Sequence, residues 1–156
     1  MASPSRTRVL APDLVGYRSR PFSVEVEKGR LRLFAKAIGE TDPIYVDDIA
    51  AQAVGYRSLP VPPTFLFCLE MERPDPYDWF RDLGIPLGRV LHGEQAFVYH
   101  ATACAGDVLT FNGEVIDIYD KKAGALEFLV QHVVITAADG GLVAEFDRTV
   151  VIRHPA

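Results

Sequence analysis

A short segment near the middle of the chain constrains the fold more than any other feature. From Thr64 to about Glu72 it has the sequence TFLFCLEME, which is apolar on almost every side of a helix until its last turn. Pro63 suits the first position of this helix, because the N–H that proline lacks would be unpaired there in any case. A helix that is apolar nearly all round has to be buried on most sides. The rest of the chain must therefore supply a surface that wraps it.

Four segments with β-type patterning follow, with glycine-containing turns between them, at about 91–103, 107–118, 125–137 and 141–153. The last segment alternates and places five apolar side chains on one face: Leu142, Ala144, Phe146, Val150 and Ile152. Arg148 interrupts that face. Such alternation is typical of an antiparallel sheet with one covered face and one wet face. A hairpin turn is expected at 139–141, where the sequence is Asp-Gly-Gly.

The first half of the chain adds smaller elements. Residues 1–21 contain three prolines and favour an N-terminal arm laid over a domain. Alternation predicts a strand over 22–27, and apolar residues at helical spacing predict an amphipathic helix over 28–38. A second short helix is expected from Asp47 or Asp48 to Val54. The order of these elements predicts an α+β fold, in which an antiparallel sheet wraps around a central helix.

Length and composition bound the architecture and the classes of partner. The 156 residues are enough for one domain, which we place at 22–156. The segment 73–89 holds three prolines, two glycines and the only tryptophan, and is predicted to be a surface loop or flap. A net charge of -5 with interspersed signs argues against nucleic acid, and no apolar run is long enough for a membrane span. The N-terminus lacks the apolar stretch of a secretory signal, so we expect a cytoplasmic location. Cys68 and Cys104 are expected to be buried free thiols.

The loop that follows the first helix carries a family resemblance. Residues 37–47 read AIGETDPIYVD, and Gly55 and Tyr56 follow the next short helix. This pattern resembles the hydratase motif of the MaoC-like hot-dog family, whose active members are (R)-specific enoyl-thioester hydratases and 3-hydroxyacyl dehydratases. The run LHGEQ at 91–95 and the Gly-Asp at 106–107 resemble more specifically its N-terminal, fatty-acid-synthase-like dehydratase branch. The resemblance implies a hot-dog fold that dimerises, an acyl-CoA or acyl-carrier-protein thioester as the substrate, and no cofactor.

The resemblance places the acid–base pair of the family on residues that depart from it. The catalytic aspartate position falls on Glu40, and the catalytic histidine position falls on Tyr45. Hydration of an enoyl thioester needs a carboxylate and an imidazole around one water molecule. A phenol has a pKa of about 10, whereas imidazole has one of about 6.5, so tyrosine is a poor base at neutral pH. We therefore expect a loop that is degenerate in catalysis, with a rewired site as the alternative.

His92 and Glu94 form a second candidate catalytic pair, because alternation in a strand would put both side chains on the same side. A structural role for His92 is the competing interpretation. His100, His132 and His154 are expected to be structural, and the spacing of the histidines matches no metal-site template, so no metal is predicted.

Three residues are candidates for substrate binding. The resemblance places Arg57 near the mouth of the acyl-pantetheine channel, where it would meet a CoA phosphate, although a solvated arginine is an equal alternative. It also implies that one flank of the central helix, with Phe65 and Phe67, lines the acyl tunnel.

Three hypotheses about function follow. The first is a substrate-tunnel subunit of a hydratase/dehydratase, a lyase, in which this chain is non-catalytic alone and a partner hydratase subunit supplies Asp and His. The second is a self-sufficient homodimeric hydratase or acyl-CoA thioesterase that uses Glu40 or Glu94. The third is a non-catalytic acyl-CoA-binding module. In each case the open edge of the sheet favours a homodimer or a heterodimer.

Overall fold

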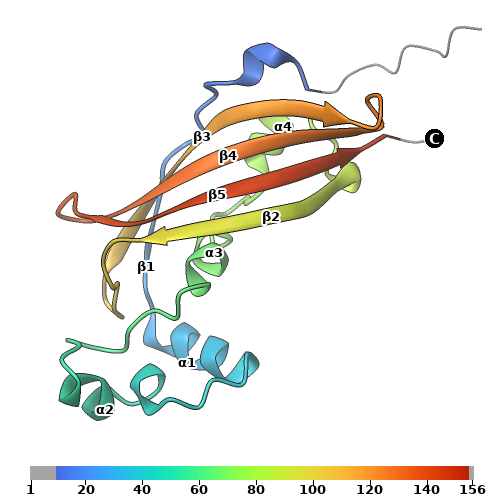
Figure 1. Ribbon diagram of the computed structural model, residues 1–156. Helices are drawn as coiled ribbons and strands as arrows, with labels where there is room; N and C mark the ends of the chain where they lie inside the picture. Colours follow the sequence, from blue (N-terminus) through green and yellow to red (C-terminus); the bar gives the residue numbers. More distant parts are fainter. Residues whose placement is uncertain (1–9, 155–156) are drawn as a thin grey trace, which may run out of the picture.

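The computed structural model describes residues 10–154. Its strands form one curved sheet of five strands (Figure 1). The strand order is β1-β3-β4-β5-β2, and every neighbouring pair is antiparallel. In chain order, β1 to β5 span Phe22–Glu25, Val90–Tyr99, Val108–Lys121, Leu126–Ala137 and Leu142–Arg153. The predicted antiparallel sheet is therefore confirmed, and the turn expected at 139–141 joins β4 to β5.

Within the described range there are four α-helices: α1 Lys28–Ala37, α2 Asp48–Ala53, α3 Phe65–Glu70 and α4 Asp78–Asp82. Short 3₁₀ helices lie at Pro12–Leu14, Pro43–Tyr45 and Leu87–Arg89. Figure 1 shows α3 beneath the curved sheet, whereas α1 and α2 form a lobe beyond one of its ends. Three apolar side chains of α3 are buried, namely Phe65, Leu66 and Leu69, which confirms α3 as the wrapped central helix.

Several boundaries differ from the sequence-based expectation. The strand expected at 91–103 ends at Tyr99, because the chain then turns toward the segment before α3, where the Val61 N–H donates to the Ala103 carbonyl at 2.8 Å. The strand expected to end near residue 118 continues to Lys121, since the hairpin turn lies further along, at Lys122 and Ala123 with positive φ. The helix expected over 64–72 is shorter at both ends.

The segment 73–89 is not the surface loop that its prolines and glycines suggest. It contains α4, and Trp79, Phe80, Leu83 and Ile85 are all buried. Of the two predicted alternatives, a surface loop or a flap, the surface loop is wrong, because these side chains pack against the sheet and complete its core. We call residues 73–89 the flap.

The part of the N-terminal arm that the structure describes, from Leu10 onward, lies along the edge of β3. The Gly16 N–H donates to the Val115 carbonyl at 2.8 Å, the Val115 N–H to the Tyr17 carbonyl at 2.9 Å, and the Ser19 N–H to the Gly113 carbonyl at 2.9 Å. The arm therefore covers the part of this edge that the short β1 leaves open. At the other side of the sheet, β2 pairs only with β5 among the described strands.

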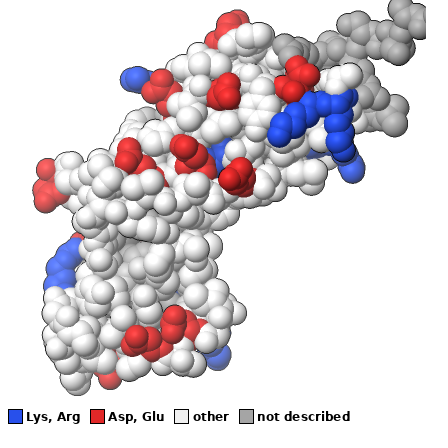
Figure 2. All heavy atoms as spheres, in the orientation of Figure 1, with Lys and Arg blue, Asp and Glu red and all other residues white. Residues whose placement is uncertain are grey.

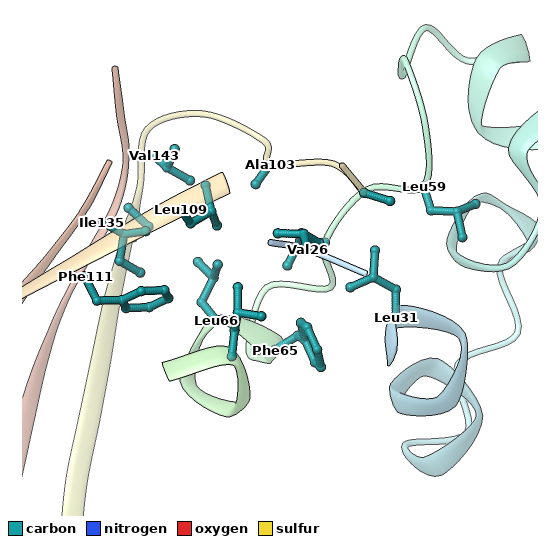
Figure 3. Close-up of a cluster of buried hydrophobic side chains, with 14 of the residues drawn as sticks. Val26, Leu31, Leu59, Phe65, Leu66, Ala103, Leu109, Phe111, Ile135 and Val143 are labelled. Atoms are coloured by element: carbon teal, nitrogen blue, oxygen red, sulfur yellow. The ribbon is translucent and has the colours of Figure 1, made fainter. Parts of the chain in front are cut away.

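Two apolar clusters fill the covered side of the sheet. Figure 3 shows Leu31 of α1, Leu66 of α3 and Phe111 of β3 in the first cluster. The second cluster lies further along the strands and joins the flap to the sheet through Trp79, Phe80, Val115, Leu129, Val150 and Ile152. Along β5, Phe146 belongs to the first cluster and Val150 to the second. The residue between them on the same face is Arg148.

Arg148 is the centre of a buried polar layer between the clusters, which we define as Arg148, Glu70, Gln131 and Gln95. Nη1 of Arg148 donates to Glu70 Oε2 at 3.0 Å, and Nη2 donates to Glu70 Oε1 at 3.4 Å and to Gln131 Oε1. Gln131 and Gln95 are its Cα partners on β4 and β2. Its guanidinium carbon lies 5.2 Å from the centroid of the Trp79 ring. The layer therefore connects the central helix, the sheet and the flap.

The Arg148–Glu70 pair gives a stability prediction. Both residues are 4% exposed, so Arg148→Met or Glu70→Met alone leaves an uncompensated buried charge and should lower the free energy of unfolding by about 3–5 kcal/mol. The double variant Arg148→Met with Glu70→Met should lose less than either single variant. Urea unfolding of the three variants measures both effects.

The exposed pair Arg18–Glu114, which joins at 3.1 Å, is the matched control, because methionine at either position should cost less than about 1 kcal/mol. Single losses at Arg148 and Glu70 that are as small as those at the control pair would contradict the buried ion pair.

Candidate functional site

The flap covers a cavity of about 440 Å³, which we call the flap cavity. Its lining comes from α3, the flap, β2 and β5, and includes Phe67, Met71, Trp79, Leu91, His92 and Arg148. Tyr77, Leu87 and Leu91, which are exposed, also line it, whereas Trp79 and Arg148 are buried. The cavity thus has an accessible rim, apolar walls and a buried end at the polar layer.

His92 lies at the accessible side of the flap cavity. It is the Cα partner of Val150, a buried residue of the same face as Arg148, so its side chain points toward the covered side of the sheet. Its ring meets the Phe67 ring edge to face, with centroids 5.4 Å apart. Two residues predicted separately, Phe67 and His92, are therefore brought together.

Glu94 does not share the side of His92. A β-bulge at Gly93 shifts the register, so Glu94 pairs with Thr149, which is the neighbour of the His92 partner along β5 and points to the opposite face. The prediction that His92 and Glu94 lie on the same side of the strand is wrong, because simple alternation does not anticipate the extra residue. Gly93 suits this place, since an added Cβ would lie 2.8 Å from Val151 Cγ2 and 3.1 Å from the Thr149 carbonyl oxygen.

The loop with Glu40 and Tyr45 is held by its own carboxylates. Glu40 Oε1 accepts the backbone N–H groups of Thr41 at 2.8 Å and Asp42 at 2.9 Å, and Asp42 Oδ1 accepts the N–H of Ile44 at 3.1 Å. The loop lies between α1 and α2, and neither Glu40 nor Tyr45 lines the flap cavity. One oxygen of Glu40 is therefore occupied in shaping the loop.

Burial, reinforced by the nearby Glu40 carboxylate, raises the pKa of the Tyr45 phenol above its usual value of 10.0. The shift is in the direction opposite to that needed for a base at neutral pH. Tyr45 can donate a hydrogen bond, but it cannot replace the imidazole that takes up and releases a proton near neutrality.

The predicted substrate-binding residues have different surroundings. The Arg57 guanidinium donates to the Asp107 carboxylate, a bond that raises the pKa of Arg57, and its side chain is 62% exposed. Phe65 is buried and its ring lies 5.1 Å from that of Phe34, so it belongs to the first cluster. Of the two phenylalanines, only Phe67 lines the flap cavity.

The other face of the sheet carries charged residues that pair with histidines, and Figure 2 shows acidic side chains scattered over it. His100 Nε2 lies 2.8 Å from Glu145 Oε2, and His132 Nδ1 lies 2.7 Å from Asp147 Oδ1. The hydrogen bond to His100 is the main cause that lowers the pKa of Glu145. Within residues 10–154, no group of three or more His, Cys, Asp or Glu side chains is placed to hold a metal ion. No helix in that range is long and apolar enough to cross a membrane.

The comparisons with known proteins agree with this architecture. Residues 13–146 match the family described as "FAS1-like, dehydratase domain region". A UPF0336 protein of Saccharopolyspora erythraea is 37% identical over 133 residues, which cover 85% of this chain and 83% of that protein.

Two solved structures from Mycobacterium tuberculosis are also similar. The first, a C-terminally truncated HadBC (3R-hydroxyacyl-ACP dehydratase) complex, has 27% identity and a TM-score of 0.75, with 88% of this chain and 97% of that chain covered. The second, the ChsH1-ChsH2 complex, has 28% identity and a TM-score of 0.70, with coverages of 89% and 90%. Together with the strand order, these matches confirm the expected hot-dog fold.

The bulge gives a second stability prediction. Gly93→Ala should lower the free energy of unfolding by about 1–3 kcal/mol, because the new methyl group meets β5 at closer than van der Waals distance. Gly29→Ala in α1 is the control, since nothing lies within 4 Å of its added Cβ and alanine favours a helix by about 1 kcal/mol. Equal urea midpoints for Gly93→Ala and the unaltered chain would rule out the close approach.

Proposed function

This chain belongs to the FAS1-like dehydratase domain family of hot-dog hydratases and dehydratases, and from that premise we propose that it is the acyl-binding subunit of an (R)-specific enoyl-thioester hydratase/3-hydroxyacyl-thioester dehydratase. Its substrate is an acyl-CoA or acyl-carrier-protein thioester. In the hydration direction, a water oxygen adds to C3 of the enoyl group and a proton is delivered to C2. The reaction needs water and acid–base groups but no further cofactor. A partner subunit supplies those groups.

The observation that carries this proposal is the state of the loop between α1 and α2. The aspartate position of the motif is a glutamate with an oxygen bound to two backbone N–H groups. The histidine position is Tyr45, whose pKa is raised. An acid–base pair for hydration must exchange protons near neutral pH, and this pair is unsuited to doing so. The flap cavity, in contrast, is suited in size and in apolar character to an acyl group.

The edge of β2 supports a dimer. Val98 and Tyr99 are 56% and 46% exposed on this strand, whose outer backbone groups have no strand partner within residues 10–154. An unpaired strand edge with exposed apolar side chains favours pairing with another chain. The two similar structures from M. tuberculosis are both complexes. We propose that β2 pairs with a catalytic hydratase subunit, or with a second copy in a homodimer.

The self-sufficient alternative has one observation in its favour, because His92 lies at the flap cavity. Its ring accepts or donates no hydrogen bond within the described residues, so it is available to a substrate. Glu94, however, points to the opposite face of the sheet. A hydratase or thioesterase built on His92 would therefore need a carboxylate other than Glu94.

The central prediction concerns activity. The purified chain should show no crotonyl-CoA hydration above background, whereas a complex with a hydratase chain that carries the Asp and His of the motif should be active. Glu40→Asp combined with Tyr45→His should raise the activity of the isolated chain, since one acid–base group typically contributes about 10²–10⁴-fold. Ultraviolet absorbance of the enoyl thioester follows the reaction.

The matched control is Glu40→Asn with Tyr45→His, which restores the imidazole without the carboxylate and should stay inactive. Robust hydration by the unaltered chain that is lost in Tyr45→Phe would contradict the proposal and establish a rewired loop. If hydration is lost in His92→Gln instead, the catalytic group is His92 on β2 and not the loop.

A further prediction concerns assembly. At tens of micromolar the unaltered chain should sediment as a dimer that buries more than about 1,000 Å² in total. Ala96→Lys with Val98→Lys should shift it to the monomer, because lysines on facing edges repel each other. Both lysines would face carboxylates in the monomer, since Ala96 pairs with Asp147 and Val98 with Glu145. Ile116→Lys, a 45% exposed position on β3, is the control. An unaltered chain that is monomeric alone and that also fails to bind a hydratase chain is the outcome that contradicts pairing at this edge.

A further inference from the structure

The flap cavity has a feature that a site for a purely hydrocarbon chain does not need, namely a polar end. Arg148 lines the cavity, although the side chain is only 5% exposed. The walls around it are apolar and include Phe67, Met71 and Trp79. A hydrocarbon chain packed there would lie against a buried guanidinium. The remaining N–H groups of that guanidinium would then have no hydrogen-bond partners, which costs free energy.

The hydrogen-bonding capacity of the polar layer is incompletely used. Nε of Arg148 is buried and has no hydrogen-bond partner, and neither the Nε2 nor the Oε1 of Gln95 has one. Gln95 is the Cα partner of Arg148, so the two side chains lie on the same face of adjacent strands. Nε2 of Gln131 is also unpaired, but it lies over Gly113, at 2.6 Å from where a Cβ would be. Donors therefore exceed acceptors in this layer, which favours an incoming acceptor atom.

The charge of the layer is already balanced. Glu70 binds Arg148 through both carboxylate oxygens, so a second carboxylate would add an uncompensated negative charge in a buried place. A neutral keto or hydroxyl oxygen satisfies the free N–H of Arg148 without that cost.

We propose that Arg148, which lines the flap cavity and has Gln95 beside it on β2 just outside the lining, makes the cavity selective for acyl groups that carry a neutral oxygen near their distal end. This inference rests on the proposed function for the thioester part of the ligand. The acyl chain enters past His92 and Leu91 at the accessible side, packs along Phe67, and places its keto or hydroxyl oxygen at the polar layer. Arg148 is thus a specificity-determining residue of the acyl site.

Trp79 provides a direct measurement of binding, because it is the only tryptophan of the chain and stacks over Arg148 at the buried end. Fluorescence titration of the full chain gives dissociation constants for three thioesters of equal length: octanoyl-CoA, 7-oxo-octanoyl-CoA and the dicarboxylic octanedioyl-CoA. The 7-oxo ligand should bind about tenfold more tightly than octanoyl-CoA, as expected for one hydrogen bond to an otherwise unpaired buried donor. Octanedioyl-CoA should bind no better than octanoyl-CoA.

Two variants test the residues. Gln95→Met removes an unpaired amide without breaking a hydrogen bond within the described residues, and should lower the preference for the 7-oxo ligand. The double variant Arg148→Met with Glu70→Met replaces the ion pair by apolar side chains and should abolish the preference. Equal affinities of the unaltered chain for the 7-oxo and plain ligands overturn the inference, as does a preference that survives in the double variant.

A pair of ligands without a thioester separates this inference from the proposed function. If 2-octanone binds more tightly than 1-octene to the unaltered chain but not to the double variant, and no CoA thioester binds, the oxygen selectivity holds while the thioester function fails. If octanoyl-CoA and 7-oxo-octanoyl-CoA bind with equal affinity, the proposed function holds and the oxygen selectivity fails.

Discussion

The structure depends on one buried ion pair, between Arg148 of β5 and Glu70 at the end of α3. A helix as short as Phe65–Glu70 is not stable by itself, so tertiary contacts have to hold it. Its apolar side chains pack into the first cluster, and its last residue binds the arginine that separates this cluster from the second. The same guanidinium lies under Trp79 and so fixes the flap. The position of α3, the covering of the sheet by the flap and the buried end of the flap cavity therefore all depend on this ion pair.

Much of the fold could be predicted because it follows from local patterns. The alternation along 141–153, the turn at 139–141 and the apolar central helix each need only neighbouring residues to be interpreted. The flap and the polar layer depend on contacts between distant residues. Arg148 was visible only as an interruption of an apolar face, and nothing local indicates that its partner is Glu70, 78 residues away. The role of Gly93 likewise becomes clear only once the pairing of β2 with β5 is known, because the bulge in that pairing separates His92 from Glu94.

The family resemblance implies two functional regions, a catalytic loop and an acyl site, and in this chain the two differ in how well they suit these functions. In the loop at 40–45 the carboxylates bind the loop's own N–H groups, and the raised pKa of Tyr45 makes its phenol a weaker acid than usual. The flap cavity has a formed wall and a buried polar end. We therefore propose a division of labour, in which this chain would bind the acyl group and the catalytic groups would come from a partner across β2. The open edge of that strand is where the two functions would meet.

Hydrogen–deuterium exchange of the full chain, with and without octanoyl-CoA, tests this division most directly. Amides become protected where a ligand orders the backbone or excludes water. Binding at the flap cavity should protect the flap and the first residues of β2, at 73–92, and leave the loop at 40–47 unchanged. Protection confined to 40–47, with none in the flap, would contradict the assignment of acyl binding to the flap cavity.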